Sequence, residues 1–373
     1  MLGRINIDEV SHKKDIELLL GRYWSFLTLT QTLKNIGDYV LIEIGTTEVV
    51  AYHSESGYVA FRNRCPHRGN RLFTKKNGNG RLRCNLHGWS FSANGQIKAI
   101  PFYAESYQYS QSEINRLRLT RYPLRQIGAF LFICLTEDLP PLENQFKPKT
   151  IKALESISEH LDARISSTEL TGAFNWKFGL EIIMDPLHAP FLHAQTLAKN
   201  RYAPTATNSP ANIRPFSPPS PDAFHLAAEA CDLSTYSSQE IKNFKQSPWF
   251  KDVSRYGALD HYYDWIFFPN LHIASASGGH SFLITHFSPI SCGQTKIYQY
   301  FTTAKEISHN PYLASVRLES LREGIKTFEE DNTACENLHR NAVAYPNEEN
   351  IHGKYELAIL RWRRWLSENV YLH

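Results

Sequence analysis

The chain has 373 residues, of which 42% are hydrophobic and 13% aromatic, so it is long enough to bury more than one core. Its formal net charge of +3 is small and dispersed, which argues against a nucleic-acid-binding protein. The sequence contains no apolar run of about eighteen residues and no apolar signal region near Met1, so we expect neither a membrane span nor a leader peptide.

The cysteines do not predict a disulfide framework. Of the six in the chain, Cys134, Cys231, Cys292 and Cys335 are scattered singly along the sequence. Scattered cysteines are typical of a reducing compartment, and we therefore expect a cytoplasmic location.

Residues 39–134 predict a small antiparallel β domain. Four segments are rich in the β-branched and aromatic residues that favour strands, namely residues 39–44, 49–52, 58–61 and 130–134. Segments rich in Gly, Asn, Asp and Ser predict turns between them, namely residues 37–38, 55–57, 77–80 and 94–95.

Two cysteine–histidine pairs interrupt this β pattern. Cys65 and His67 form the first pair, and Cys84 and His87 form the second, so together they supply two thiolates and two imidazoles. Such a set can hold a [2Fe–2S] cluster, which transfers one electron at a time. A glycine shortly after each histidine would let two loop tips approach one cluster. A structural Cys2His2 zinc site is the alternative, although it usually has both cysteines before both histidines.

Basic residues flank both pairs. They indicate either a solvated hairpin surface or a positive rim that steers an acidic electron donor towards the cluster. The residues are Arg62, Arg64, Arg68, Arg71, Lys75, Lys76, Arg81 and Arg83.

The pattern changes after the β domain. Residues 139–150 begin with Leu-Pro-Pro and predict a linker. Beyond it, spacing predicts a helix over 174–188, several strands over 262–303 and a long amphipathic helix over 313–338. The proline-rich segment 203–222 predicts either a disordered loop or a functional lid.

The first of these helices contains a second candidate metal site. Glu181, Asp185 and His188 are four and three residues apart, so we expect them to share one helix face. Pro190 is expected to break the helix, which would let His188 and His193 meet at one metal. Two histidines near a helix end are by themselves a weak signal, because many such residues are simply surface or core.

A carboxylate would complete the 2-His-1-carboxylate set typical of non-haem Fe(II) oxygenases. Asp331 is the candidate, because it lies on the apolar side of the long helix, where an ionised carboxylate is costly unless paired or metal-bound. A partner arginine or a helix kink is the alternative explanation, and Glu330 and Glu336 are other candidate ligands. The apolar stripe consists of Leu321, Ile325, Phe328, Cys335 and Leu338.

The two cysteine–histidine pairs resemble the Rieske motif. Membrane-complex Rieske proteins carry an extra cysteine in each loop, whereas this chain has Asn70 and Asn85 near those places. The resemblance is therefore to the soluble branch of ferredoxin-type proteins and oxygenases. It implies that the two cysteines bind one iron and the two histidines bind the other, which makes the cluster easier to reduce than an all-cysteine cluster.

The spacing Glu-x3-Asp-x2-His-x4-His, followed by a later aspartate, resembles the catalytic subunit of Rieske non-haem iron oxygenases. The resemblance implies a mononuclear Fe(II) held by His188, His193 and Asp331. It also implies that Asp185 hydrogen-bonds His87 of a neighbouring subunit in a head-to-tail homotrimer and so connects the two metals. The chain departs from the family pattern at three positions, Ile182, Pro186 and Leu187, and Pro186 is expected to kink the helix.

The resemblance also implies the fold and the domain organisation. The expected class is α+β. A small antiparallel β Rieske domain would span residues 20–137. A larger helix-grip, START-like catalytic domain, with an antiparallel sheet and helices, would comprise residues 1–19 and 138–373.

By the same resemblance, the chain is expected to be a terminal oxygenase that uses O2 to hydroxylate or oxidatively demethylate a small aromatic compound or amine, as in aromatic hydrocarbon catabolism. No G-x-G-x-x-G opens a helix, so a separate ferredoxin or flavin reductase would supply electrons, and NAD(P)H would act only through it. Mono- and dioxygenation both stay open. The alternatives are desaturation or oxidative cyclisation on the same fold, and an electron-transfer or ligand-binding protein with an inactive second site.

Five aromatic residues in the predicted strands could line an apolar or cation–π substrate pocket. Aromatic residues in strands more often pack in a core, so both interpretations stay open. The residues are Tyr262, Tyr263, Trp265, Phe267 and Phe268.

Overall fold

The computed structural model describes residues 5–136, 141–185, 187–194, 196, 232–241, 244–353 and 355–371. The chain divides into two compact units, a smaller unit of residues 20–140 and a larger unit of residues 1–19 and 141–373. The predicted loop or lid over 203–222, Cys231, Pro186 and the first part of the predicted linker lie outside the described residues.

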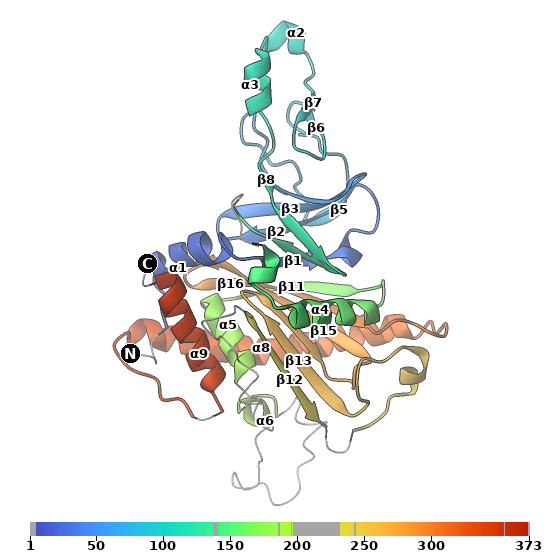
Figure 1. Cartoon of the computed structure of the whole chain (residues 1–373), viewed down its shortest axis with the longest axis vertical. Helices are drawn as coiled ribbons and strands as arrows, with labels where there is room; N and C mark the ends of the chain where they lie inside the picture. The colour runs from blue at the N-terminus through green and yellow to red at the C-terminus, as the bar shows by residue number, and fades with distance from the viewer. Residues whose placement is uncertain are drawn as a thin grey trace, which may run out of the picture. The chain divides into compact units, whose positions relative to one another are not determined.

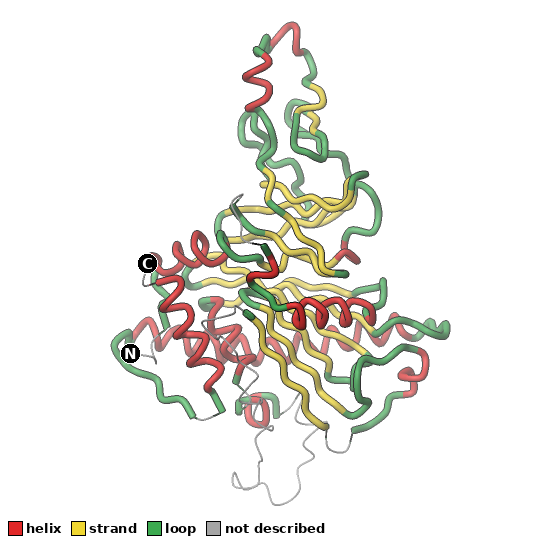
Figure 2. The backbone as a smooth tube through the Cα atoms, in the orientation of Figure 1, coloured by secondary structure: helices red, strands yellow, loops and turns green. Residues whose placement is uncertain are grey.

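The smaller unit is built of antiparallel strands, as predicted (Figure 2). A five-stranded sheet has the order β5-β2-β3-β4-β8, a three-stranded sheet has the order β1-β10-β9, and β6 pairs with β7. The strands are β1 Ser25–Leu29, β2 Asp38–Ile44, β3 Thr47–Ser54, β4 Gly57–Arg62, β5 Asn77–Asn79, β6 Ser90–Phe91, β7 Ile97–Ala99, β8 Arg121–Tyr122, β9 Leu124–Ile127 and β10 Phe130–Ile133. The short helices are η2 Thr30–Thr32, α2 Tyr103–Ser106 and α3 Gln111–Arg116.

One predicted turn is wrong. Residues 77–79 form β5, which pairs with the first residues of β2. The side-chain amide of Asn79 donates to the carbonyl of Ile36 at 3.0 Å and to Asp38 Oδ1 at 2.8 Å. These bonds hold a glycine- and asparagine-rich segment against the sheet edge, although its composition favours a turn.

The larger unit contains one six-stranded antiparallel sheet of order β11-β16-β15-β14-β13-β12. The strands predicted over 262–303 are confirmed, and together with the helices they confirm the α+β class. The strands are β11 Ser166–Gly172, β12 Ser234–Glu240, β13 His261–Phe267, β14 Leu271–Ser275, β15 Ser281–Ser291 and β16 Gln294–Thr303.

Helices of several lengths accompany this sheet. The segment predicted as a linker contains the short helix η3 and the start of α4, which begins with a proline in its first turn. None of the described helices is long and apolar enough to cross a membrane. The helices are α1 Glu9–Lys14, η1 Asp15–Leu20, η3 Leu142–Asn144, α4 Pro148–His160, α5 Trp176–Met184, α6 Ala189–Leu192, η6 Pro248–Asp252, α8 Leu313–Ala344, α9 Leu357–Leu366 and η7 Ser367–Tyr371.

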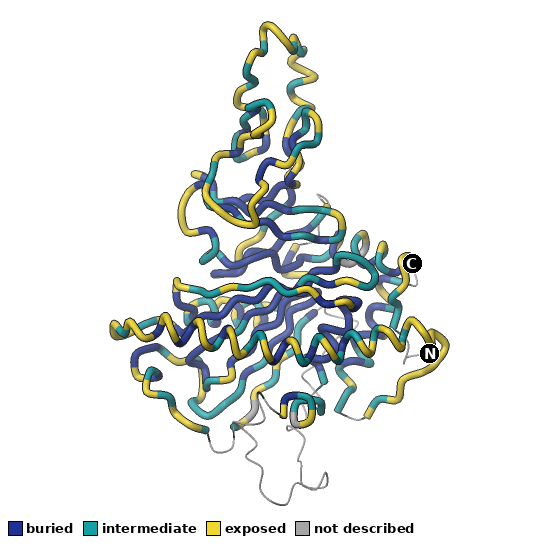
Figure 3. Tube along the Cα trace, turned by 180° about the vertical axis from the view of Figure 1, so that it is seen from behind, coloured by how far each residue is buried: buried dark blue, intermediate teal, exposed yellow. Residues whose placement is uncertain are grey.

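The long predicted helix is α8, which crosses one face of the six-stranded sheet (Figures 1 and 3). Phe328 of α8 packs on Phe287 of β15, with ring centroids 6.4 Å apart. Leu321, Phe328 and Cys335 of the predicted apolar stripe are buried. The prediction for Leu338 is wrong, since this side chain is 49% exposed.

The single helix predicted over 174–188 is wrong. Helix α5 ends at Met184, and Asp185 is extended, with φ −89° and ψ 110°. Asp185 precedes Pro186, and a residue before proline is driven away from helical geometry by the proline ring. Pro190 does not break the helix as predicted, because it lies in the first turn of α6, where proline is tolerated.

Two buried ion pairs hold α5 in place. Lys177 is fully buried and pairs with Asp15, which also accepts a 3.0 Å hydrogen bond from Trp176 Nε1. One turn later, Glu181 forms a two-bonded pair with Arg363 of α9, with both N–O distances 2.7 Å. Segments from distant parts of the sequence therefore fix the helix that leads to the candidate metal ligands.

We predict that Arg363→Met lowers the free energy of unfolding of the larger unit by about 3–5 kcal/mol, because it leaves the Glu181 carboxylate buried without its partner. Urea unfolding followed by tryptophan fluorescence would measure the change. Trp362 precedes Arg363, and its ring centroid lies 6.2 Å from that of Trp176 on α5, so both tryptophans report on this contact. The double variant with Glu181→Met should regain most of the loss.

The matched control is Lys326→Met, which removes an exposed pair with Glu323 and should change stability by less than about 1 kcal/mol. Equal effects of Arg363→Met and Lys326→Met would contradict the proposed importance of the buried pair.

Candidate functional site

The two cysteine–histidine loops of the smaller unit have the same backbone construction. The N–H of Cys65 donates to the carbonyl of Asn70 at 2.7 Å, and the N–H of Gly69 donates back to the carbonyl of Cys65 at 3.0 Å. The loop at Cys84 repeats both bonds, at 2.8 and 2.9 Å. Gly69 and Gly88 have φ of +77° and +73°, which side chains disfavour, so glycine is required at both turns.

The loops present four donors to one place. Cys65 and Cys84 are 1% and 2% exposed, and all five described cysteines are free thiols. The rings of His67 and His87 are half-buried, with centroids 4.7 Å apart. His87 Nδ1 is buried and has no hydrogen-bond partner among the described residues, as expected for an atom reserved for a metal. The donor set therefore fits a cluster with mixed sulfur and nitrogen ligands.

Asn70 and Asn85 tie the two loops together. Asn70 Nδ2 donates to Asn85 Oδ1 at 2.9 Å and approaches Cys84 Sγ at 3.6 Å. These asparagines stand near the places of the extra cysteines in the membrane-complex proteins. An amide–amide hydrogen bond thus links loops that a disulfide would otherwise link.

The four candidate ligands differ in their local electrostatics. Burial raises the pKa of the Cys65 thiol to about 11. Burial acts in the same direction on Cys84, but backbone N–H donors from Leu86 and His87 and the amide of Asn70 lower its pKa overall. Burial lowers the pKa of His67, which favours the neutral imidazole that binds metals.

Aromatic rings cover one side of this site. Trp89 is fully buried and stacks on His67 with a centroid distance of 4.5 Å and an interplanar angle of 6°. Tyr107 meets the same imidazole edge-on at 5.4 Å. The eight basic residues predicted around the loops are all exposed, and Arg71 among them pairs with Glu48.

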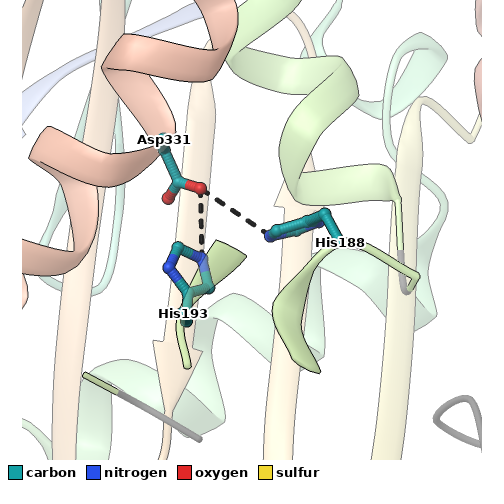
Figure 4. A group of neighbouring side chains, drawn as sticks. All are labelled: His188, His193 and Asp331. Atoms are coloured by element: carbon teal, nitrogen blue, oxygen red, sulfur yellow. Dashed lines mark ion pairs between the residues drawn. The ribbon is translucent and has the colours of Figure 1, made fainter. Parts of the chain in front are cut away.

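In the larger unit, the structure brings His188, His193 and Asp331 together (Figure 4). One ligand atom from each residue lies within 4.8 Å of the other two. Asp331 Oδ1 is 3.1 Å from His193 Nε2 and 3.7 Å from His188 Nε2. The aspartate comes from α8, whereas the two histidines flank α6.

A second contact orients each imidazole. His193 Nδ1–H donates to Glu330 Oε2 at 2.7 Å, and His188 Nδ1–H donates to the carbonyl of Asp185 at 2.7 Å. With Nδ1 occupied, each ring turns Nε2 towards Asp331. Outer contacts of this kind fix the tautomer and ring direction of metal-binding histidines.

Asp331 itself favours a metal over a structural role. Its side chain is 10% exposed, and no arginine or lysine of the described ranges pairs with it. The close contacts of Oδ1 are with the two imidazoles, and a buried carboxylate oxygen that meets two imidazole nitrogens fits a divalent cation. Burial lowers the pKa of His193, but Asp331 and Glu330 raise it overall, so a metal must displace a proton there.

Two predicted residues lie away from the triad, and Asp185 lies beside it. Glu181 points to Arg363, and Glu336 accepts the N–H of Ala173 at 2.9 Å, so neither is at the triad. The side chain of Asp185 accepts the N–H of Leu187 at 2.7 Å, with Oδ2 3.7 Å from His188 Nδ1.

Glu330 was predicted only as a substitute ligand, whereas in the structure its carboxylate contacts His193 Nδ1, the ring nitrogen that does not face Asp331. The sequence signal for this role is weak. It consists only of a carboxylate next to the ligand Asp331.

Comparison with known proteins identifies the two domains in which the candidate sites lie. The family model described as Rieske [2Fe-2S] domain matches residues 23–122, and the model described as ring hydroxylating alpha subunit (catalytic domain) matches residues 159–370. The large oxygenase component of a naphthalene 1,2-dioxygenase system from Pseudomonas aeruginosa is 29% identical over 205 residues, which are 52% of this chain and 44% of that protein. The chain thus spans about half the length of the curated relatives it matches.

Solved structures share the fold. The quaternary ammonium Rieske monooxygenase CntA in complex with L-carnitine has a TM-score of 0.72 at 14% identity, covering 96% of this chain and 92% of that one. Naphthalene 1,2-dioxygenase from Rhodococcus sp. bound to indole has a TM-score of 0.73 at 16% identity, covering 97% and 92%.

We predict that Glu330→Gln weakens Fe(II) binding at the triad by about 10- to 100-fold, because the histidine loses a charged hydrogen-bond partner. Titration of the metal-depleted triad with Fe(II), read by the iron retained after gel filtration, would measure the change. Glu329→Gln is the matched control, since the neighbouring side chain is exposed. An equal affinity in the two variants would contradict the role assigned to Glu330.

Proposed function

From the premise that the chain belongs to the ring-hydroxylating alpha-subunit family and carries a Rieske [2Fe-2S] domain, we propose that it is the terminal component of a multicomponent oxygenase. It would take electrons from a separate reductase and hydroxylate or oxidatively demethylate a small organic substrate. The observation that carries this proposal is the meeting of three side chains at one point, where buried Asp331 Oδ1 lies 3.1 Å from His193 Nε2 and 3.7 Å from His188 Nε2.

The proposed ligands are Cys65, His67, Cys84 and His87 for the cluster, and His188, His193 and Asp331 for the mononuclear iron. When bound, the cluster would transfer single electrons and the iron would activate O2. Glu330 would keep the proton on His193 Nδ1 and thereby hold Nε2 towards the metal. The carbonyl of Asp185 would do the same for His188. Three ligands arriving from α6 and α8 would leave the remaining coordination positions for O2 and substrate.

The proposed electron donor is an acidic ferredoxin or flavin reductase. The support is the exposed basic rim around the cluster loops, because opposite charges steer association. His67 and His87 are the partly exposed members of the cluster site, which makes them the natural point of approach.

We also propose that Asp185 accepts a hydrogen bond from His87 of a neighbouring copy in a homotrimer. The Asp185 side chain is 21% exposed and keeps one oxygen outside its bond to Leu187, so it is available to an outside donor. A structure of CntA has been described in terms of inter-subunit electron transfer, which supports the same arrangement here.

The substrate class proposed is an aromatic compound or an amine. Relatives and structural neighbours include naphthalene 1,2-dioxygenase and the quaternary ammonium monooxygenase CntA. Tyr263, Trp265 and Phe267 are unsuited to line the pocket, because strand alternation places them on the face of the sheet opposite Phe287 and α8.

Iron analysis combined with oxygen uptake tests the proposed function. The protein reconstituted with iron and sulfide should hold three irons per chain, show a Rieske EPR signal and consume O2 when supplied with reductase, NADH and an accepted substrate. His188→Ala should lose one iron and leave the cluster absorbance unchanged. Two irons per chain in the unaltered protein would reject the oxygenase.

We predict that Asp185→Asn retains both metals but lowers turnover by about 10- to 100-fold, since the amide loses the negative charge of the proposed bridge. Asp260→Asn, at an exposed aspartate of the same unit, is the control and should be inert. Metal content, single-turnover cluster oxidation and product formation would be measured together. Normal turnover in Asp185→Asn would defeat the bridging role.

A further inference from the structure

The face of the six-stranded sheet beneath the triad can be identified from packing and strand alternation. Phe287 contacts Phe328 of α8, and a side chain at Gly179 of α5 would have a Cβ only 2.7 Å from the Phe287 ring. A Cβ at Gly324 of α8 would lie 3.6 Å from Leu283. Both helices therefore cover the same face of β15. Asp331 follows Phe328 by one helical turn, so the triad belongs to this side of the sheet.

A polar row crosses this face between apolar ones. Thr285 lies between Leu283 and Phe287 on β15 and so points to the covered face. Strand register places His272 of β14 on one side of Thr285 and Gln299 of β16 on the other. The row His272–Thr285–Gln299 thus runs beneath the turn of α8 that precedes Asp331.

The polar atoms of this row are buried without partners. Thr285 and Gln299 are 0% exposed and His272 is 4% exposed. His272 Nδ1, Thr285 Oγ1 and both amide atoms of Gln299 lack a hydrogen-bond partner among the described residues. Each buried polar atom without a hydrogen-bond partner lowers the stability of the folded chain by about 1–3 kcal/mol. Several in one row therefore leave hydrogen-bonding capacity that a bound group or a buried water can satisfy.

A carboxylate fixes the orientation of His272. Asp264 of β13 accepts hydrogen bonds from His272 Nε2 at 3.0 Å and from Tyr262 Oη at 2.9 Å. With its proton on Nε2, the imidazole offers Nδ1 as an acceptor. Thr285 Oγ1 is a second possible acceptor beside it. The row is therefore equipped to receive an N–H or O–H group.

Apolar rows flank the polar one on both sides. Ala274, Leu283 and Phe301 lie opposite one another in one neighbouring row, and Phe287 pairs with Ile297 in the other. A ligand lying on this face would meet apolar side chains along most of its surface and polar atoms along one line.

We propose that the substrate is an apolar or aromatic compound bearing an N–H or O–H group, which donates to His272 Nδ1 or Thr285 Oγ1. This inference rests on the proposed function, because it concerns the substrate of the same site. A plain hydrocarbon of equal shape leaves the row unmatched and binds more weakly. Sites built to hydrogen-bond a substrate group reject analogues that lack it.

Two shape-matched pairs test the inference, namely indole against indene and aniline against toluene. Calorimetry on the full iron-loaded chain gives the Kd of each compound, and reductase-driven product formation gives kcat/KM. The N–H member of at least one pair should bind about 10- to 100-fold more tightly than its hydrocarbon partner. Thr285→Val and His272→Leu should reduce this ratio by weakening only the N–H member.

Thr171→Val is the matched control, because Thr171 is exposed on β11 and points to the opposite face. The inference is overturned if the unaltered protein binds the two members of each pair with Kd values within about twofold of each other. It is also overturned if neither Thr285→Val nor His272→Leu changes the ratio of the two Kd values. A clear binding preference without substrate-dependent O2 uptake would support the polar row while counting against the proposed function.

Discussion

The placement of helix α5 depends on two charges buried on adjacent turns of its surface. Lys177 and Glu181 each meet an opposite charge, Asp15 and Arg363, which the sequence places far away. A buried ion pair contributes less to net stability than to defining one arrangement, because the desolvation cost offsets most of the attraction. Any other position of α5 would leave a charge unmatched. The two ion pairs therefore determine where the segment that carries His188 begins, because other positions of α5 would leave a buried charge without its partner.

The two candidate metal sites achieve ligand orientation in different ways. At the cluster loops, repeated backbone hydrogen bonds, two left-handed glycines and one amide–amide bond shape the turns. At the triad, the Glu330 side chain and the backbone carbonyl of Asp185 each accept a hydrogen bond from Nδ1 of one imidazole. The first arrangement allows half-buried histidines at a loop tip. The second requires long-range packing to bring α6 against α8.

Local patterns in the sequence predicted what depends on local physics. The strands over 39–61 and 262–303, the long helix and the α+β class are confirmed, because alternation and helical spacing reflect burial directly. The Cys-His pairs and the His-x4-His spacing marked residues that do lie together, although their roles as ligands stay predictions. The break at Asp185 was assigned to the wrong proline. The partner of Glu181, the contact of Glu330 and the strand at 77–79 depend on residues distant in sequence, and no local pattern contains them.

The two ion pairs of α5 have a consequence for the order in which contacts form along the chain. Asp15 is available early in synthesis, but Arg363 follows every proposed metal ligand in the chain. Contacts between residues far apart in sequence form late, because closing the long loop between them costs entropy before the contact stabilises the chain. During synthesis, the chain therefore contains His188, His193 and Asp331 before it contains Arg363, the partner of Glu181. The arrangement of the triad therefore depends on the C-terminal helix α9 as well as on the segments that carry its three residues.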